Sequence, residues 1–439
     1  MIKYNILFCI LFILINVNLL FSQKDITDSL TDYYQQNYLR YDNHIYKENI
    51  KTVLLHRDGW ELSYPVIMLN SEDKLKFSFD DLDADIKDYY YTLLHCNSDW
   101  TPSNLTTFDY IDGFIKNKIP DYENSFNTLI RYTHYNLILP NDDFWFKLSG
   151  NYLLKIFEDY DEENPVITRR LFVVQQEVGI KVSVKQPVMI EKRNNSHEID
   201  FSIEYQQNQI LNPYRDIKVV IAQNNRWDNA IDDLEPLFVK DDILIYDYDQ
   251  NNLFKAGSEF RHFDIKSLRY LTDKVNDIKF ISPDYHVKLF TDEKRSFKRY
   301  FFDQDLNGKY LIKVQERNNA ETEAEYVYVY FQLNMEFPLI HGNLYVFGGL
   351  SDWRCEKNNL MTYNYENKCY ELKMLLKQGY YNYEYVYLED GILNIDNNYI
   401  EGSHYETEND YLIFIYHRDL SLNYDKLVGF QIVNSVINK

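Results

Sequence analysis

The chain alternates short apolar segments with polar turns, and one construction of this kind recurs three times. In each copy an apolar run ends at a tryptophan, and a later Gly-x-Tyr opens a second apolar run. The tryptophans are Trp100, Trp227 and Trp353, and the Gly-x-Tyr segments are 150–152, 308–310 and 379–381. Strict alternation of apolar and polar residues, as in residues 74–79 (KLKFSF), is typical of a half-buried strand. Three copies of such a unit predict a repeated all-β architecture.

The three units predict three tandem immunoglobulin-like or early-set β-sandwich domains, with helix confined to short turns. A chain of 439 residues is too long for one ordinary hydrophobic core, which agrees with this count. The junctions near residues 175–178 and 334–338 are short and poor in Gly and Ser, so we expect docked domains in a semi-rigid row. The expected segments are 1–22 (signal peptide), 23–48 (N-terminal segment), 49–176 (first sandwich), 177–335 (second sandwich) and 336–439 (third sandwich).

Residues 1–22 have the features of a secretory signal peptide. Lys3 supplies the positive charge, an apolar run follows from Ile6 to Leu20, and Ser22 is a small residue before the expected cut. The alternative is a membrane anchor, but the run is shorter than the roughly 20 apolar residues that a spanning helix needs. Since Cys9 lies within the run and not at the cut, a lipoprotein anchor is disfavoured.

The composition favours β structure, and the charge disfavours two kinds of partner. The chain has 41 Tyr and 27 Phe against only 13 Gly and 10 Pro, and aromatic side chains favour pleated, half-buried surfaces. Its formal net charge is −22, which repels phosphate backbones and anionic lipid surfaces. We therefore expect neither nucleic acid nor a membrane surface as the direct partner.

The cysteines do not indicate a disulfide scaffold or a metal centre. Three remain after the signal peptide: Cys96, Cys355 and Cys369. Cys355 and Cys369 flank an expected turn and strand, so a disulfide between them is one open alternative in an oxidising compartment. No His or Cys pairs occur at ligand spacing, so we expect no metal and no other cofactor.

The residues that resemble catalytic or ion-binding motifs have simpler structural explanations. His95 and Cys96 are adjacent on an expected strand and point to opposite faces, so His95 cannot readily activate the thiol. Residues 303–308 (DQDLNG) match the first half of a calcium loop, but the twelfth position is Val314, which has no carboxylate. No G-x-S-x-G, H-E-x-x-H or glycine-rich phosphate loop is present. We therefore expect a binding protein that is not an enzyme.

The third unit resembles the glycogen-binding type of early-set immunoglobulin-like module. The similarity lies in residues 344–353, which end at Trp353, and in residues 379–386. At least two of the three tryptophans are expected to be core or corner residues; the three are Trp100, Trp227 and Trp353. Of these, Trp353 is the better candidate for a sugar-stacking platform. A carbohydrate-binding periplasmic or surface protein is therefore the alternative function.

The first unit is similar to the first domain of the plug protein of the Bacteroidota type IX (type 9) secretion system. The similarity is carried by residues 95–100, 109–114, 125–128, 131–135 and 149–152. The motif residues, with structural or interaction roles, are His95, Cys96, Asn97, Trp100, Asp112, Gly113, Asn127, Thr128, Tyr132, His134, Tyr135, Gly150 and Tyr152.

This resemblance extends over the mature chain and implies a function. It implies a soluble periplasmic protein that binds the outer-membrane translocon barrel and plugs its periplasmic end. It brings no catalytic residue and no cofactor. We expect the binding face on the long loops between Trp100 and Tyr135, where aromatic and polar residues mix without strict alternation.

Overall fold

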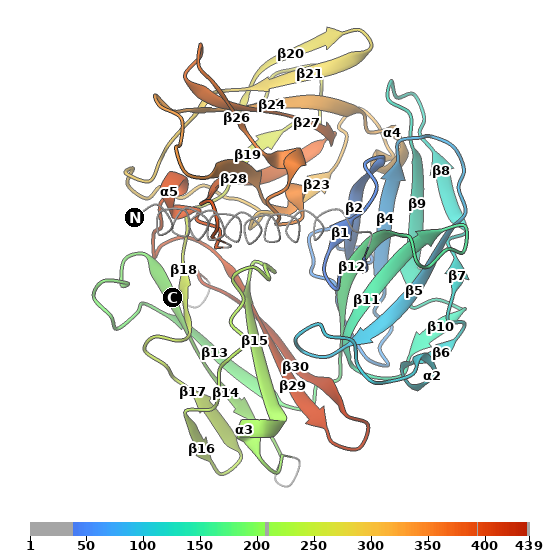
Figure 1. Cartoon of the computed structure of the whole chain (residues 1–439), viewed down its shortest axis with the longest axis vertical. Coiled ribbons are helices and arrows are strands. Elements are labelled where there is room, and N and C mark those ends of the chain that lie inside the picture. Colours follow the sequence, from blue (N-terminus) through green and yellow to red (C-terminus); the bar gives the residue numbers. More distant parts are fainter. Residues whose placement is uncertain (1–37, 207–209, 393, 437–439) are drawn as a thin grey trace, which may run out of the picture.

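The computed structural model describes residues 38–206, 210–392 and 394–436, and it is almost entirely β (Figure 1). The predicted signal peptide and residues 23–37 of the N-terminal segment lie outside the described residues. The helices of the described part are four-residue turns: α2 (Thr107–Tyr110), α3 (Pro213–Asp216), α4 (Ala320–Glu323) and α5 (Asn398–Glu401), with the 3-10 turns η1 (Gly349–Ser351) and η2 (Lys357–Asn359). The predicted all-β sandwich class is confirmed. Over these same ranges no helix is long and apolar enough to cross a membrane.

The first sandwich packs a four-stranded sheet against a six-stranded sheet. The smaller sheet has the order β2 (Ile50–Arg57), β4 (Leu75–Asp81), β9 (Thr133–Leu139), β8 (Asp121–Asn124). The larger has the order β1 (His44–Ile45), β12 (Pro165–Val174), β11 (Gly150–Glu158), β5 (Tyr89–Cys96), β7 (Asn117–Lys118), with β3 (Val66–Met68) parallel to β12. Phe77 and Phe79 on one sheet and Leu154 and Ile156 on the other share a buried core, as the alternation of apolar residues predicts.

The second sandwich is built from two segments that are far apart in the sequence. One sheet contains β13 (Gly179–Lys185), β14 (Ser196–Glu204), β17 (Ile243–Tyr246) and β16 (Phe238–Lys240), with β18 (Leu253–Lys255) paired to β14. The facing sheet contains β15 (Ile217–Gln223), β29 (Asp410–Asp419) and β30 (Tyr424–Asn434). Figure 1 shows the C-terminal hairpin β29–β30, in red, beside the green strands of this sandwich.

The third sandwich lies between these two segments in the sequence. One sheet contains β19 (Arg261–Asp264), β28 (Gly379–Leu388) and β23 (Tyr310–Ile312), with β25 (Asn343–Phe347) also paired to β28. The other contains β20 (Val275–Ile281), β21 (Asp284–Leu289), β24 (Tyr326–Asn334), β27 (Cys369–Lys377) and β26 (Thr362–Asn364), with β22 (Asp292–Glu293) on β24. Phe263, Phe331 and Tyr383 contribute to the core between the two sheets.

The strand pairing crosses the boundary that the sequence predicts between residues 335 and 336. β24 precedes this boundary and β27 follows it, yet the two strands pair, with Tyr326 opposite Lys377. The hairpin β29–β30 pairs back to β15, with Ile217 opposite His417. The ranges 177–335 and 336–439 therefore do not correspond to separate sandwiches. An apolar strand is recognised locally, but its neighbour in the sheet is chosen by burial of side chains that come from remote segments.

The second copy of the predicted repeat is also divided between two sandwiches. Trp227 follows β15 in the second sandwich, whereas Tyr310 lies on β23 in the third. Tyr310 is opposite Tyr381 of the third copy, and their rings stack with centroids 5.2 Å apart. A repeat unit running from Trp227 to Tyr310 is therefore wrong. The two Gly-x-Tyr segments resemble one another because each places a tyrosine on an apolar strand of the same sheet.

Candidate functional site

Most motif residues of the first sandwich lie in three places; the exceptions are Tyr135, in the core of this sandwich, and Asp112 and Gly113, on β6 (Ile111–Gly113). One group contacts the second sandwich, another contacts the third, and a third surrounds His95 at one end of the first sandwich. The larger sheet is consequently buried on both faces: Leu154 points into the first core, and its neighbour Leu153 packs toward the second sandwich.

Trp100 and Trp227 contact each other across the junction of the first and second sandwiches. Trp100 is 5% exposed and Trp227 is half-buried. Their rings meet edge to face with centroids 5.5 Å apart, and Phe172 stacks on Phe414 of β29 beside them. The guanidinium of Arg170 lies 4.2 Å from the Trp100 ring and 5.1 Å from the Trp227 ring. The expected burial of Trp100 is confirmed. The residues around it come from two sandwiches, because the apolar face of each sandwich is buried against the other.

Hydrogen bonds extend this junction beyond the tryptophans. Asn151 on β11 donates to the carbonyl of Asn97 (3.0 Å) and accepts from the Tyr416 hydroxyl (2.8 Å). The backbone N–H and hydroxyl of Ser98 both donate to Asp425 on β30, at 3.0 and 2.8 Å. Burial opposes ionisation of Asp425, but the bonds from Ser98 and the charge of Lys218 hold its pKa below the usual value. The turn that contains Asn97 therefore fixes the second sandwich on the first.

A buried ionic network joins the first sandwich to the third. Asp80 on β4 accepts from His134 Nδ1, from the Tyr326 hydroxyl and from Lys377 Nζ, each at 2.6 Å. Asp80 and Lys377 are almost completely inaccessible. Burial disfavours the charged Asp80, but Lys377 and His134 outweigh this effect and lower its pKa. His134 Nε2 is 3.5 Å from Glu321 Oε2, and the two carboxylates raise the pKa of His134 against the effect of burial.

The loop before His134 is held against the same part of the third sandwich. The Phe126 N–H donates to the Thr322 carbonyl (2.8 Å), and the Tyr132 hydroxyl donates to the Ala324 carbonyl (2.9 Å). Asn127 has a left-handed backbone (φ 58°), and Thr128 donates to Ser125 (3.0 Å), so both shape the turn. The sequence predicts the binding face on the loops between Trp100 and Tyr135. This part of it is therefore occupied by contacts with the third sandwich of the same chain. Tyr135 itself is in the core of the first sandwich, where its ring stacks on Phe79.

His95 lies at the end of β5, enclosed by tyrosines. It is 3% exposed, and its ring contacts Tyr110, Tyr152 and Tyr424 at centroid distances of 5.6, 5.0 and 5.3 Å. Burial lowers the pKa of His95 to about 4, so the ring is neutral near pH 7. Its Nε2 is 3.3 Å from the Ser149 carbonyl, which assigns the proton to Nε2 and leaves Nδ1 as an acceptor.

Cys96 lies on the opposite face from His95, as the alternation of strand residues requires. Its side chain packs with Trp100 and Leu153 at the junction with the second sandwich. Burial raises the pKa of the Cys96 thiol to about 12. The thiol is therefore protonated near neutral pH, which agrees with a packing role.

Cys355 and Cys369 carry free thiols, so the disulfide considered from the sequence is not formed. Cys369 begins β27 opposite Asn334, and its Sγ is 3.4 Å from Glu371 Oε1. Cys355 packs with Trp353 and Val386 in a separate apolar cluster. Sequence spacing places the two residues near one turn, but the backbone directs them to different surroundings.

Trp353, the candidate sugar platform, is packed within the chain. A Cβ at Gly308 would lie 2.2 Å from the Trp353 ring, and Phe260 and Phe347 meet the ring at centroid distances of 5.8 and 5.5 Å. The Arg226 guanidinium lies 5.6 Å from the ring centroid. These contacts indicate that the half-buried Trp353 side chain has a packing role. No observation at this position favours carbohydrate binding.

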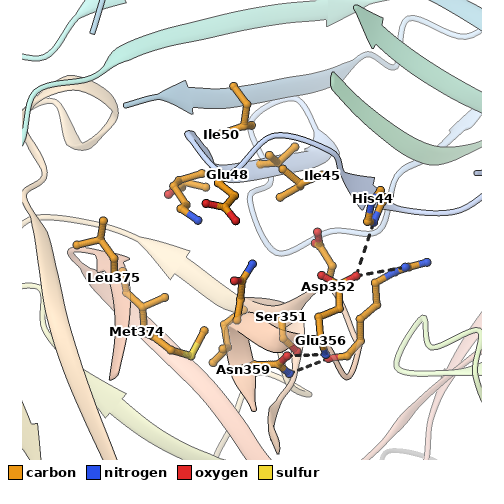
Figure 2. Close-up of a pocket in the computed structure, with 18 of the residues that line it drawn as sticks. His44, Ile45, Glu48, Ile50, Ser351, Asp352, Glu356, Asn359, Met374 and Leu375 are labelled. Atoms are coloured by element: carbon orange, nitrogen blue, oxygen red, sulfur yellow. Dashed lines mark hydrogen bonds and ion pairs between the residues drawn. The ribbon is translucent and has the colours of Figure 1, made fainter. Parts of the chain in front are cut away.

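A cavity of about 180 Å³ separates the N-terminal strands of the first sandwich from η1 and η2 of the third (Figure 2). Polar side chains line it: His44 Nδ1 is 3.6 Å from Glu356, and Arg169 forms an ion pair with Asp352, to which it donates at 2.9 Å. Burial and the neighbouring arginines lower the pKa of His44 to about 3. The cavity is therefore part of a charge-paired junction between sandwiches.

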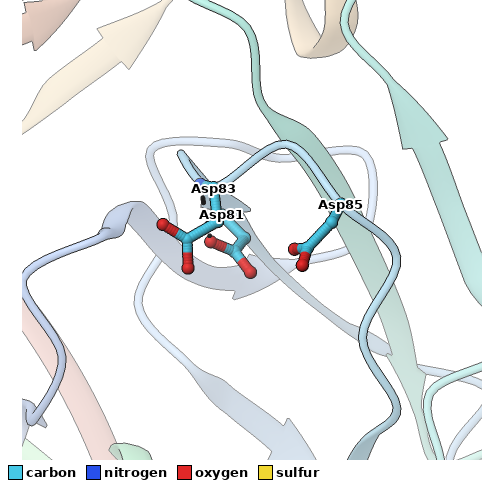
Figure 3. Close-up of side chains that lie close together, drawn as sticks. All are labelled: Asp81, Asp83 and Asp85. Atoms are coloured by element: carbon cyan, nitrogen blue, oxygen red, sulfur yellow. Dashed lines mark hydrogen bonds between the residues drawn. The ribbon is translucent and has the colours of Figure 1, made fainter.

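Two acidic clusters are also explained by internal partners. Asp81, Asp83 and Asp85 converge after β4 (Figure 3), and Lys87 forms ion pairs with all three. In the calcium-like segment, Asp305 accepts from the backbone N–H of Asn307 (2.7 Å), which is a turn interaction. In the cluster after β4 the positive charge comes from Lys87. In the calcium-like segment the turn accounts for the carboxylate of Asp305.

Sequence reasoning missed the residues that complete these junctions, namely Asp80, Arg170, Lys377 and Asp425. Asp80 and Lys377 do carry a local signal, because each charged residue directly follows an apolar residue of its strand. A buried charge needs a partner, but the sequence does not indicate which residue supplies it.

Comparisons with known proteins identify the first sandwich. The family model described as "Type 9 secretion system plug protein 1st domain" matches residues 50–175. A crystal structure of a hypothetical protein from Parabacteroides merdae at 2.30 Å resolution is 35% identical to the chain, with a TM-score of 0.87. That similarity covers 90% of this chain and 100% of the other. No curated protein matches the chain.

Proposed function

We propose that this chain, which belongs to the family of type 9 secretion system plug proteins, binds the outer-membrane translocon barrel of that system and closes its periplasmic end. The observation that carries this proposal is the match of the family model to residues 50–175, which span the first sandwich from β2 to β12. The proposed action is steric and has no catalytic step.

The junctions between the sandwiches support this role. A protein that closes a wide aqueous opening needs a fixed shape, because a flexible chain would enter the channel or leave gaps. The Trp100–Trp227 contact joins the first sandwich to the second, and the Asp80–Lys377 pair joins it to the third. The first sandwich therefore connects the other two through buried contacts, which resist relative motion more than exposed ones.

The charge of the chain supports a protein partner in preference to the lipid surface. A net charge of −22 is repelled by anionic headgroups. We propose a periplasmic location, peripherally associated with the outer membrane through the translocon, which accords with the predicted signal peptide at residues 1–22.

The test combines membrane permeability with recovery of the partner. Deleting the gene in a strain that keeps its translocon should increase entry of a large antibiotic, while secretion continues at least in part. Restoring the wild-type gene should reverse the effect. A tagged copy should recover a large β-barrel protein from solubilised outer membranes. Unchanged permeability together with no recovered barrel would refute the proposal.

A further inference from the structure

The loop that follows β22 exposes three phenylalanines within six residues. Phe297 is 89% exposed, Phe301 80% and Phe302 54%, and no other large apolar side chain of the described ranges is more exposed than Phe297. The Cα atoms of residues 297 and 302 can be at most about 18 Å apart, so the three rings belong to one small region of the surface. A single exposed apolar residue is ordinary, but a group of aromatic residues indicates an interaction site.

The same loop is anchored to the body of the third sandwich on both sides of Phe297. The backbone N–H of Arg295 donates to the Ile400 carbonyl on α5 (2.9 Å), and its Nε donates to the buried carboxylate of Glu401 (2.5 Å). The Tyr300 hydroxyl donates to Glu259, which is also buried (2.5 Å). The exposed rings therefore lie on a loop that is already held in place, which lowers the entropic cost of binding a partner.

The positive charges of this loop give its surface a sign opposite to that of the whole chain, whose net charge is −22. Lys298 pairs with Glu293 at 3.0 Å, but both side chains are more than half exposed, so this pair contributes little. Arg299 is exposed and forms no hydrogen bond or ion pair with any residue that the structure describes. Arginine beside aromatic residues is typical of protein interfaces, and its charge complements an acidic partner.

The backbone of the loop favours a protein partner over lipid. Residues 299–305 belong to no helix or strand, and none of their backbone N–H or carbonyl groups forms a hydrogen bond with a described residue. Irregular backbone of this kind is not tolerated in the hydrocarbon region of a bilayer, because its polar groups would lose their partners. A protein surface can supply both an apolar pocket for the rings and polar groups for the backbone.

We propose that residues 294–303, the Phe297 loop, bind an apolar pocket with an acidic rim on a protein partner. Phe297 and Phe301 enter the pocket, and Arg299, which lies between them in the chain, pairs with a carboxylate of the rim. This inference rests on the proposed function, because the partner is the translocon barrel. It adds a specific contact to that function and places it on the third sandwich.

The first experiment compares how much barrel protein is recovered from solubilised outer membranes by tagged full-length chains. Phe297→Ser/Phe301→Ser should lower recovery about tenfold, because it removes the apolar side chains that enter the pocket. The matched control is Phe280→Ser/Phe337→Ser, which alters two exposed phenylalanines elsewhere on the third sandwich and should not lower recovery. Both variants should keep the urea midpoint of the wild type, since the altered side chains are exposed.

The outcomes separate the loop from the proposed function. Loss of recovery in the Phe297→Ser/Phe301→Ser variant alone supports the proposal. Equal recovery by all three chains, or an equal loss in both variants, overturns the role of the loop and leaves the proposed function standing. Recovery by none of the chains, wild type included, refutes the proposed function and this contact together.

The second experiment tests the charge and the other possible occupants. Arg299→Glu should lower recovery, most strongly at low ionic strength, whereas Arg299→Lys should retain most of it; recovery unchanged in Arg299→Glu would overturn the acidic rim. Vesicles of phosphatidylethanolamine and phosphatidylglycerol test lipid, and analytical ultracentrifugation tests a second copy. Vesicle binding or dimerisation that Phe297→Ser/Phe301→Ser abolishes would assign the loop to that occupant and overturn the proposal, and the absence of both supports it.

Discussion

A Cβ atom at Gly150 would lie 2.3 Å from His95 Nε2, so the absence of a side chain at residue 150 allows His95 to occupy its buried position. Gly150 has φ +149°, which L side chains rarely adopt. The two residues lie on adjacent strands, β11 and β5, and both belong to the motif of the first sandwich. The glycine is therefore explained by the close approach of a neighbouring imidazole ring.

Gly150→Ala should lower the free energy of unfolding by about 2–4 kcal/mol, because the methyl group overlaps His95 and the backbone is strained. Urea denaturation measures the change. Gly59→Ala is the matched control: its φ is +78°, but nothing lies within 4 Å of the added Cβ, so only backbone strain of about 1 kcal/mol is expected. Equal losses in the two variants would show that His95 is not displaced.

Trp100→Ala should lower the free energy of unfolding by about 3–5 kcal/mol, the usual range for truncating a buried tryptophan. The lost contacts include the Trp227 ring and the Arg170 guanidinium at the junction of two sandwiches. Trp60→Ala, at a position 66% exposed, should change the free energy by about 0.5 kcal/mol or less. A loss below about 1 kcal/mol for Trp100→Ala would contradict this account of the junction.

Lys377→Met should destabilise the chain by about 3–5 kcal/mol, because it leaves the inaccessible Asp80 carboxylate without its main positive partner. Lys181→Met removes an ion pair with Glu204 in which the lysine is 72% exposed, and should cost at most about 1 kcal/mol. The Asp80→Asn/Lys377→Met double variant should recover part of the loss when unfolding is followed with urea. No recovery would mean that lost packing, and not the unpaired charge, dominates.

His134 should make stability depend on pH in a defined direction. Its pKa is raised in the folded chain, so its charged form binds Asp80 and Glu321 more favourably than in the unfolded chain. The stabilisation is complete below the unfolded pKa of about 6.5 and is lost as the pH rises through the folded pKa. The difference in unfolding free energy between the wild type and His134→Asn should therefore decrease above pH 6.5. The comparison with the variant is needed because His44 and His95, whose pKa values are lowered, destabilise the fold on acidification. A difference that stays constant from pH 5.5 to 9 would contradict a charged His134.

Several features could be predicted from the sequence because they depend on neighbouring residues. The alternation in residues 74–79 predicts β4, since a strand exposes successive side chains to opposite faces. The same rule correctly separates His95 from Cys96. The motif within residues 95–152 identifies the family of the first sandwich, which the family model matches over residues 50–175.

Other features depend on residues that only the folded chain brings together. No local pattern indicates that β29–β30 pairs with β15, that Tyr310 stacks on Tyr381, or that Trp100 and Trp227 share one cluster. Strand pairing and junction packing are decided by which apolar faces can be buried together, and many distant segments have compatible faces. The sequence by itself therefore determined the strand character, the β-sandwich class and the family of the first sandwich. The tertiary structure alone decided the pairing of distant strands, the partners of Asp80 and the enclosure of His95 by tyrosines, because burial makes each of these depend on segments far apart in the chain.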